Sequence, residues 1–150
     1  MTYHVERRCG WGQRQQPRFE VRERPPIEVL IALENGELAK KLSWSIAREA
    51  EGFQANVCWI HLDGREIELP PISFHLAIID GRACNAEDIA QQVRYADHNV
   101  VIACINAAIY GADDPDERVR EWYSQDALKQ KSSLENVLWS LLHVVYDRRF

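Results

Sequence analysis

Short apolar runs alternate along this chain with stretches of helical periodicity. Four runs have the length of a β-strand, and they lie at residues 27–33, 56–62, 74–79 and 100–105. Runs that are apolar almost throughout, rather than at every second position, are typical of strands covered on both faces. The pattern therefore predicts a mainly parallel sheet with a layer of structure on each side.

Helix signals stand between and after these runs. Asn35, Asn85 and Ser133 each occupy a position where an N-cap would open a helix, and apolar residues follow each at spacings of three and four. The pair Asp114-Pro115 predicts a further short helix over residues 114–123. The helix after Ser133 carries a broad apolar stripe and is predicted to close the fold.

Two places depart from a simple strand–helix alternation. Asp63-Gly64 followed by the alternating residues 65–69 predicts a hairpin, and Pro70-Pro71 argues against a regular helix before the next strand. The second helix of the alternation is therefore expected to be short or missing. A fifth strand is weakly indicated, at best over residues 127–129.

Strands that alternate with helices predict the α/β class, here a doubly wound, five-stranded parallel sheet of the flavodoxin-like type. This domain is expected to span residues 26–150. Residues 1–25 hold six arginines and three glutamates and are expected to form a flexible basic arm, mostly irregular in structure.

Composition and charge argue against several classes of protein. With 46% hydrophobic and 27% charged residues the chain reads as globular, and no apolar run approaches the ~18 residues of a membrane helix. No secretory signal is visible, so a cytoplasmic location is expected. The net charge of −5 argues against nucleic acid as the main partner. The four cysteines are widely spaced, which argues against a zinc site.

Polar residues stand where three of the predicted strands end. Glu34 and Asn35 follow the first strand, Asp80 follows the third, and Asn106 follows the fourth. Because ligands bind outside the carboxyl ends of such strands, Glu34 and Asp80 could hold Mg²⁺, and Asp80 could accept a phosphoryl group beside it. The simpler interpretation is that Asp80 opens a turn and Glu34 is solvated, and spacing alone favours it.

Three segments resemble the receiver domain of two-component signalling. Residues 27–42 (IEVLIALENGELAKKL) are similar to its first strand and helix, with Glu34-Asn35 at the acidic pair. Residues 76–80 (LAIID) resemble its third strand, which implies that Asp80 stands at the phospho-acceptor position. Residues 101–107 (VIACINA) are similar to its fourth strand. The resemblance spans about residues 27–148 and implies a flavodoxin-like fold.

The phosphorylation site of a receiver is altered in this chain. Asn35 stands in place of the second acid of the pair, and Asn106 in place of the switch hydroxyl. The Lys-Pro dipeptide of receivers is missing, and Lys129 and Lys131 are the nearest lysines. These substitutions indicate a degenerate receiver.

A further stretch of the sequence resembles one particular group of receiver-like regions. Residues 79–94 (IDGRACNAEDIAQQVR) resemble the receiver-like region of the type-8 cAMP phosphodiesterases. That likeness implies the regulatory segment of a larger enzyme. The chain has no His-Asp dipeptide of a metal-dependent phosphodiesterase, so it is not expected to hydrolyse cAMP itself.

The expected function is therefore that of a non-catalytic pseudo-receiver without a cofactor, which acts by contacts with a protein partner or a second copy. Trp122 and Tyr123 are the expected contact residues. Two alternatives stay open. One is a working receiver that uses Asp80 and Mg²⁺, and the other is a flavodoxin-like domain that binds a nucleotide or another small molecule.

Overall fold

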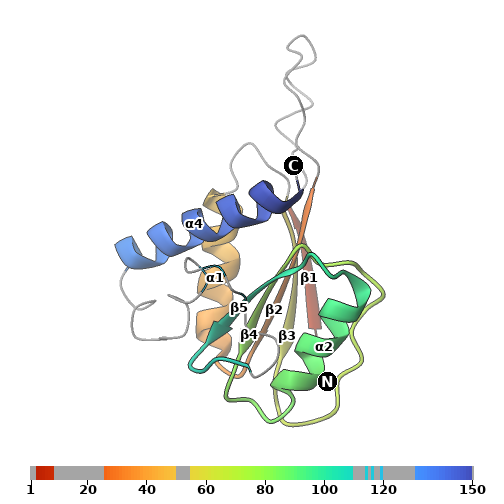
Figure 1. The fold of residues 1–150 in the computed structure, drawn as a ribbon. Helices are drawn as coiled ribbons and strands as arrows, with labels where there is room; N and C mark the ends of the chain where they lie inside the picture. The colour runs from red at the N-terminus through yellow and green to blue at the C-terminus, as the bar shows by residue number, and fades with distance from the viewer. Residues whose placement is uncertain are drawn as a thin grey trace.

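The computed structural model describes residues 3–8, 26–49, 55–109, 114, 116, 119 and 131–149 (Figure 1). The elements in chain order are β1 (Tyr3–Arg8), β2 (Ile27–Leu33), α1 (Gly36–Glu49), β3 (Ala55–His61), β4 (Leu76–Asp80), α2 (Ala86–Ala96), β5 (Val101–Ile105) and α4 (Lys131–Arg149). Strands β2, β3, β4 and β5 coincide within two residues at each end with strands that the sequence pattern predicts, and α1 and α2 begin directly after the predicted N-caps Asn35 and Asn85. Helix α4 begins at Lys131, so the predicted N-cap Ser133 lies inside the helix.

These strands form one sheet in the order β1-β3-β2-β4-β5. The four strands from β2 to β5 are mutually parallel, which confirms the α/β class. The fifth parallel strand predicted at residues 127–129 lies outside the described part of the chain.

The sequence pattern predicts no strand at residues 3–8, and the rest of residues 1–25 lies outside the described part of the chain. Strand β1 is an addition to the predicted sheet. It pairs antiparallel with β3, with Tyr3 opposite Ile60 and Arg8 opposite Ala55. The pairing joins residues about fifty positions apart, so no local pattern indicates it. Strand β1 supplies hydrogen-bond partners to an edge of β3 that would otherwise be open.

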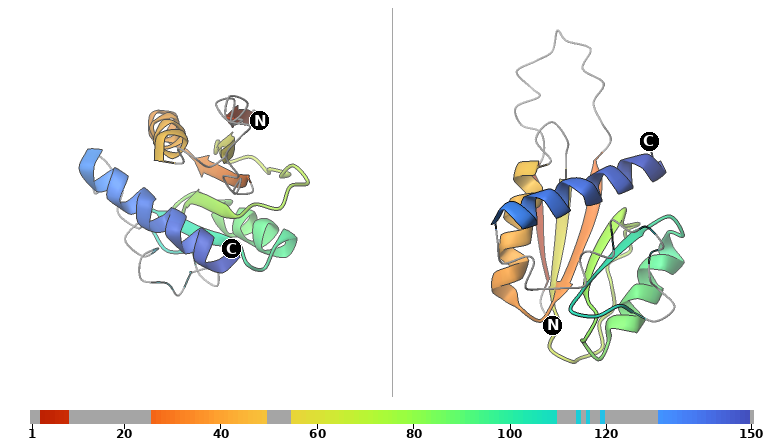
Figure 2. Two further views of the ribbon diagram at one scale, coloured as in Figure 1. Left: turned by 90° about the horizontal axis from the view of Figure 1, so that it is seen from above. Right: turned by 60° about the vertical axis from the view of Figure 1, so that its left-hand side comes forward.

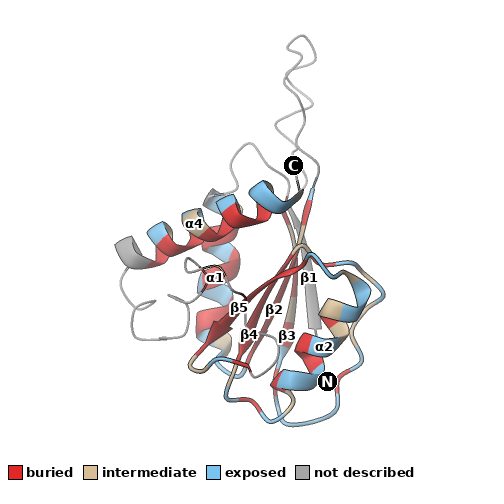
Figure 3. Cartoon of the chain, viewed as in Figure 1, coloured by how far each residue is buried: buried red, intermediate tan, exposed pale blue. Residues whose placement is uncertain are grey.

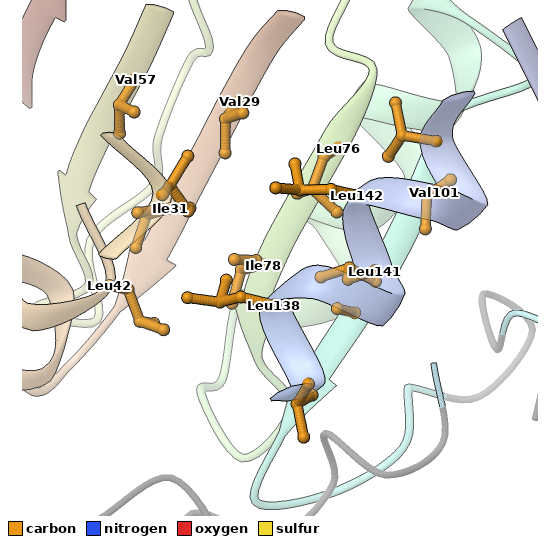
Figure 4. Close-up of a cluster of buried hydrophobic side chains, with 14 of the residues drawn as sticks. Val29, Ile31, Leu42, Val57, Leu76, Ile78, Val101, Leu138, Leu141 and Leu142 are labelled. Atoms are coloured by element: carbon orange, nitrogen blue, oxygen red, sulfur yellow. The ribbon is translucent and has the colours of Figure 1, made fainter. Parts of the chain in front are cut away.

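One face of the sheet is covered by α1 and α4, as the view from above shows (Figure 2). Val29 and Ile31 of β2, with Leu76 and Ile78 of β4, point to this side and belong to one buried cluster with the helices (Figure 4). Helix α4 contributes its apolar stripe to that cluster. Its members are Leu134, Val137, Leu138, Leu141, Leu142, Val144 and Val145.

The opposite face is covered by α2 and by the segment of residues 62–75, hereafter the covering segment. Leu30 of β2 and Ile79 of β4 pack there in a second cluster with Ile89 of α2 and Phe74 of the segment. Every residue of β4 and β5 is buried (Figure 3). Two-sided burial is what the continuous apolar runs predicted.

The covering segment contains no helix, which confirms the missing second helix, but the hairpin predicted over residues 65–69 is wrong. The strand before it, β3, already pairs with β1 on one side and β2 on the other, so a returning strand has no free edge. The alternation in this stretch has another cause. Ile67 is buried in the cluster under α2, and Leu69 packs against it.

Gln92 of α2 supplies hydrogen bonds that a neighbouring strand would otherwise provide. Its Nε2 donates to the Ile67 carbonyl oxygen at 2.9 Å, and its Oε1 accepts from the Leu69 N–H at 3.2 Å. Nε2 also lies 2.9 Å from Oδ2 of Asp88, one turn earlier. The amide thereby holds the covering segment against the helix.

None of the described helices combines the length and the apolar character needed to cross a membrane.

Replacing Gln92 by alanine tests this role. The Gln92→Ala variant is expected to lower the free energy of unfolding by about 1–3 kcal/mol, because it leaves the backbone groups of Ile67 and Leu69 without partners. Urea denaturation measures the change. Gln91→Ala, at the exposed neighbouring position, is the matched control and should change stability by less than about 0.5 kcal/mol. Equal losses in the two variants would contradict the role of Gln92.

Candidate functional site

The carboxyl ends of the parallel strands meet at one edge of the sheet, as the sequence predicted. Asp80 is the last residue of β4, Glu34 follows β2, and Asn106 follows β5. Strand β4 lies between β2 and β5 in the sheet, so Asp80 occupies the middle of this edge.

The carboxylate of Asp80 is directed into the protein and bonded there. Asp80 is only 5% exposed, and its Oδ1 accepts hydrogen bonds from Asn106 Nδ2 and from the Arg82 N–H, both at 3.1 Å. A buried carboxylate without donors would be strongly unfavourable, so these two bonds offset part of the cost of its burial. They also connect the loop after β4 with the loop after β5.

The backbone closes the same edge tightly. The Gly81 N–H donates to the Ile105 carbonyl oxygen at 2.8 Å, and a Cβ atom at Gly81 would overlap the Ala107 carbonyl oxygen. Asn106 has a φ of 72°, in the left-handed region that asparagine tolerates better than most residues. Glycine at 81 and asparagine at 106 therefore suit backbone positions that few other residues could occupy.

Glu34 and Asn35, which stand at the acidic pair of a receiver, make no hydrogen bond with Asp80. Asn35 Oδ1 accepts the Leu38 N–H at 3.1 Å and caps α1, as its position predicted. Glu34 is exposed and has no hydrogen bond or ion pair to a described residue. Within the described ranges, no three His, Cys, Asp or Glu side chains cluster in a way that could hold a metal ion.

The remaining predicted site residues lie at the margin of what the structure describes or beyond it. Lys131 is the first residue of α4, and its side chain is outside the described part. Lys129, Trp122 and Tyr123 lie outside the described residues altogether.

Asn85 has a different role from the predicted one. It occupies the N-cap position of α2, but its side chain makes no capping bond. Its Nδ2 instead donates to the Arg65 carbonyl oxygen at 3.0 Å. Asn85 therefore joins the loop after β4 to the covering segment, and only the contact between these distant segments reveals that role.

Two thiols of the described part are buried and one is exposed. Burial, and to a smaller extent the charge of Glu28, raise the pKa of Cys58 to about 11, so this thiol stays protonated at neutral pH and is a poor nucleophile. Cys104 is also buried, whereas Cys84 is exposed beside the Asp80 loop. The pKa of the exposed Asp63 carboxyl is lowered, chiefly because it accepts the Arg65 N–H.

A partly buried ion pair, which the sequence pattern does not predict, lies outside this edge. Asp114 is buried, accepts the Asp116 N–H at 3.1 Å, and receives two hydrogen bonds from the Arg148 guanidinium, the one from Nη1 at 2.7 Å. Asp114 therefore fastens the chain after β5 to the last turns of α4. The helix predicted over residues 114–123 lies mostly outside the described residues, and Asp116 is not helical.

An open groove of about 350 Å³ lies between α2 and the covering segment. It is lined by Leu69, Pro70, Pro71, Ile72, Ser73, Phe74, Gln92, Val93, Tyr95 and Ala96. These residues precede β4 or belong to the carboxyl-terminal half of α2, so the groove lies away from Asp80.

No protein-family model, no curated protein and no solved structure matches this chain.

Two glycine substitutions test how closely the backbone at Gly81 approaches the Ala107 carbonyl, beside Asp80. Gly81→Ala is expected to lower the free energy of unfolding by about 3 kcal/mol, because the new Cβ would overlap the Ala107 carbonyl. Gly36→Ala is the matched control: its Cβ would lie 3.6 Å from the Trp59 ring, and the change should raise stability by about 0.5 kcal/mol. Thermal or urea unfolding measures both, and a Gly81→Ala protein as stable as the parent would contradict the close approach.

Proposed function

We propose that this chain is a regulatory pseudo-receiver domain, which is not a catalyst and acts through contacts with other protein surfaces. The strand order β3-β2-β4-β5 supports this, because it matches the first four strands of the flavodoxin-like order. The positions of Asp80 and Asn106 at the ends of β4 and β5 agree with the receiver resemblance of the sequence.

The proposal rests on one observation, which is that the Asp80 carboxylate is buried and hydrogen-bonded inside the protein. A phosphoryl acceptor must present a carboxylate oxygen to the donor and to a cation that neutralises the developing charge. Here one oxygen of Asp80 already accepts two internal hydrogen bonds in a buried position. We infer that the carboxylate holds two loops together and does not exchange phosphate.

The partners that a receiver uses for phosphorylation have other roles in this proposal. The side-chain oxygen of Asn35, which stands where the second acid would be, accepts the Leu38 N–H and caps α1. The Asn106 amide stands where the switch hydroxyl would be and is bonded to Asp80 in the free protein. A hydroxyl switch that moves toward a phosphoryl group therefore has no counterpart here.

A working receiver remains the competing proposal, and one observation favours it. Asp80 Oδ2 accepts no hydrogen bond from the described residues, so this oxygen is where a phosphoryl group would have to attach. The finer proposal, a regulatory segment of a cAMP phosphodiesterase, rests on the sequence resemblance of residues 79–94 alone.

Titration with Mg²⁺ and beryllofluoride, followed by amide NMR shifts, separates the two proposals. Beryllofluoride mimics an aspartyl phosphate, so a competent acceptor captures it. We expect no saturable shifts at Asp80, Asn106 or Glu34. The same titration of Asp80→Ala is the control, because shifts common to both proteins arise elsewhere. Saturable shifts at the three residues that vanish in Asp80→Ala would establish a phospho-accepting receiver instead.

A further inference from the structure

The face formed by α1 and α4 carries two exposed tryptophans. Among the described residues, large exposed hydrophobic side chains occur at Trp44 (63% exposed), Tyr95 (89%) and Trp139 (58%). Trp44 belongs to α1 and Trp139 to α4, the two helices that cover the same side of the sheet (Figure 2). Tyr95 belongs to α2 on the opposite side.

Trp44 lies in the middle of a basic stripe on α1. Lys40, Trp44 and Arg48 recur every four residues, a spacing that places them on one side of the helix, and all three are exposed. Lys41 is exposed beside them. We call Lys40, Trp44 and Arg48 the basic stripe.

Trp139 lies within an acidic stripe on α4. Glu135, Trp139, His143 and Asp147 also recur every four residues, and the last three are exposed while Glu135 is partly so. The rings of Trp139 and His143 contact each other, with centroids 4.0 Å apart. These four residues are the acidic stripe.

The two stripes meet at one end of each. Arg48 Nη2 and Glu135 Oε1 are 3.4 Å apart, so the end of the basic stripe meets the start of the acidic one. Along both helices exposed residues alternate with the buried ones that face the sheet (Figure 3). An exposed pair such as Arg48–Glu135 stabilises the fold little, but it fixes which parts of the helices are neighbours.

We propose that this face binds a second copy of the chain, with the basic stripe of each copy against the acidic stripe of the other. Two-fold symmetry makes every contact occur twice, so a surface with adjacent basic and acidic stripes is complementary to itself. Each stripe contributes a tryptophan, a residue enriched in the energetic centres of interfaces. An acidic foreign partner would match only α1 and would place its charges against Glu135 and Asp147. The inference rests on the proposed function in that the domain acts by protein contacts.

Sedimentation equilibrium of the full chain at concentrations up to about 1 mM tests the proposal. We expect a monomer–dimer equilibrium whose Kd rises at least about 30-fold in Trp44→Ala and in Trp139→Ala. Tyr95→Ala is the control, since it removes an even more exposed aromatic ring from the other side and should leave Kd unchanged. Far-UV circular dichroism shows that each variant is folded.

A charge exchange makes the test specific to the two stripes. Lys40→Glu with Lys41→Glu makes α1 acidic, and Glu135→Lys with Asp147→Lys makes α4 basic. Each double variant alone should dimerise at least about tenfold more weakly, because like charges then face each other. A mixture of the two should form heterodimers with nearly the parent affinity, because both contacts again join opposite charges.

A chain that is monomeric at every concentration, or a dimer that neither tryptophan variant weakens, would overturn the proposal. A mixture of the charge variants that does not restore association would also overturn it. The experiments distinguish a failure of the second-copy contact from a failure of the proposed regulatory function. A monomer that does not capture beryllofluoride refutes only the second-copy contact, and a dimer that captures it refutes only the loss of phosphorylation.

Discussion

Burial of the sheet on both faces is the constraint on which the rest of this structure depends. The strands β4 and β5 expose no residue, and β2 buries all but Glu28 fully, so each side of the sheet needs a cover. Helices α1 and α4 cover one side. On the other side α2 covers only part, and a segment without helix or strand completes the layer. Such a segment needs partners for its buried backbone groups, and the Gln92 side chain bonds two of them.

The same constraint shapes the carboxyl edge of the sheet. Loops that leave adjacent buried strands run close together, and Gly81 and Ala107 approach so closely that no side chain fits between them. A carboxylate in this position must find donors, and Asp80 finds them in Asn106 and the Arg82 N–H. Three of the polar residues that suggest a phosphorylation site in the sequence, Asn35, Asp80 and Asn106, are thus bonded to the loops and helix that surround them.

Local patterns predicted most of the described fold, and long-range contacts account for what they missed. Continuous apolar runs predicted the parallel strands, and Asn35 predicted the start of α1. The pairing of Tyr3–Arg8 with β3 could not be predicted, because nothing near β1 in the chain indicates its distant partner. The false hairpin at residues 65–69 has the same origin, since the alternation there reflects packing under α2 and not pairing.

The sequence predicts where the residues of the candidate site lie, but not which hydrogen bonds and backbone contacts they make. Strand ends showed where Glu34, Asp80 and Asn106 would lie, because parallel strands end at one edge. The direction of the Asn106 amide and the close backbone contact at Gly81 depend on loop geometry that residue types alone do not determine. The sequence pattern does not indicate the exposed stripe on α4, because the apolar periodicity of this helix marks its buried side and Trp139 lies on the other side.

The coupling between Asp80 and Asn106 tests most directly whether this carboxylate is structural. A double-mutant cycle with Asp80→Ala and Asn106→Gly, read by urea unfolding, isolates it, since glycine also adopts the backbone angle of Asn106. If the carboxylate holds the two loops together, the cycle yields a coupling energy of about 1.5 kcal/mol or more. Effects that add to within about 0.5 kcal/mol, or an Asp80→Ala protein more stable than the parent, would contradict the account.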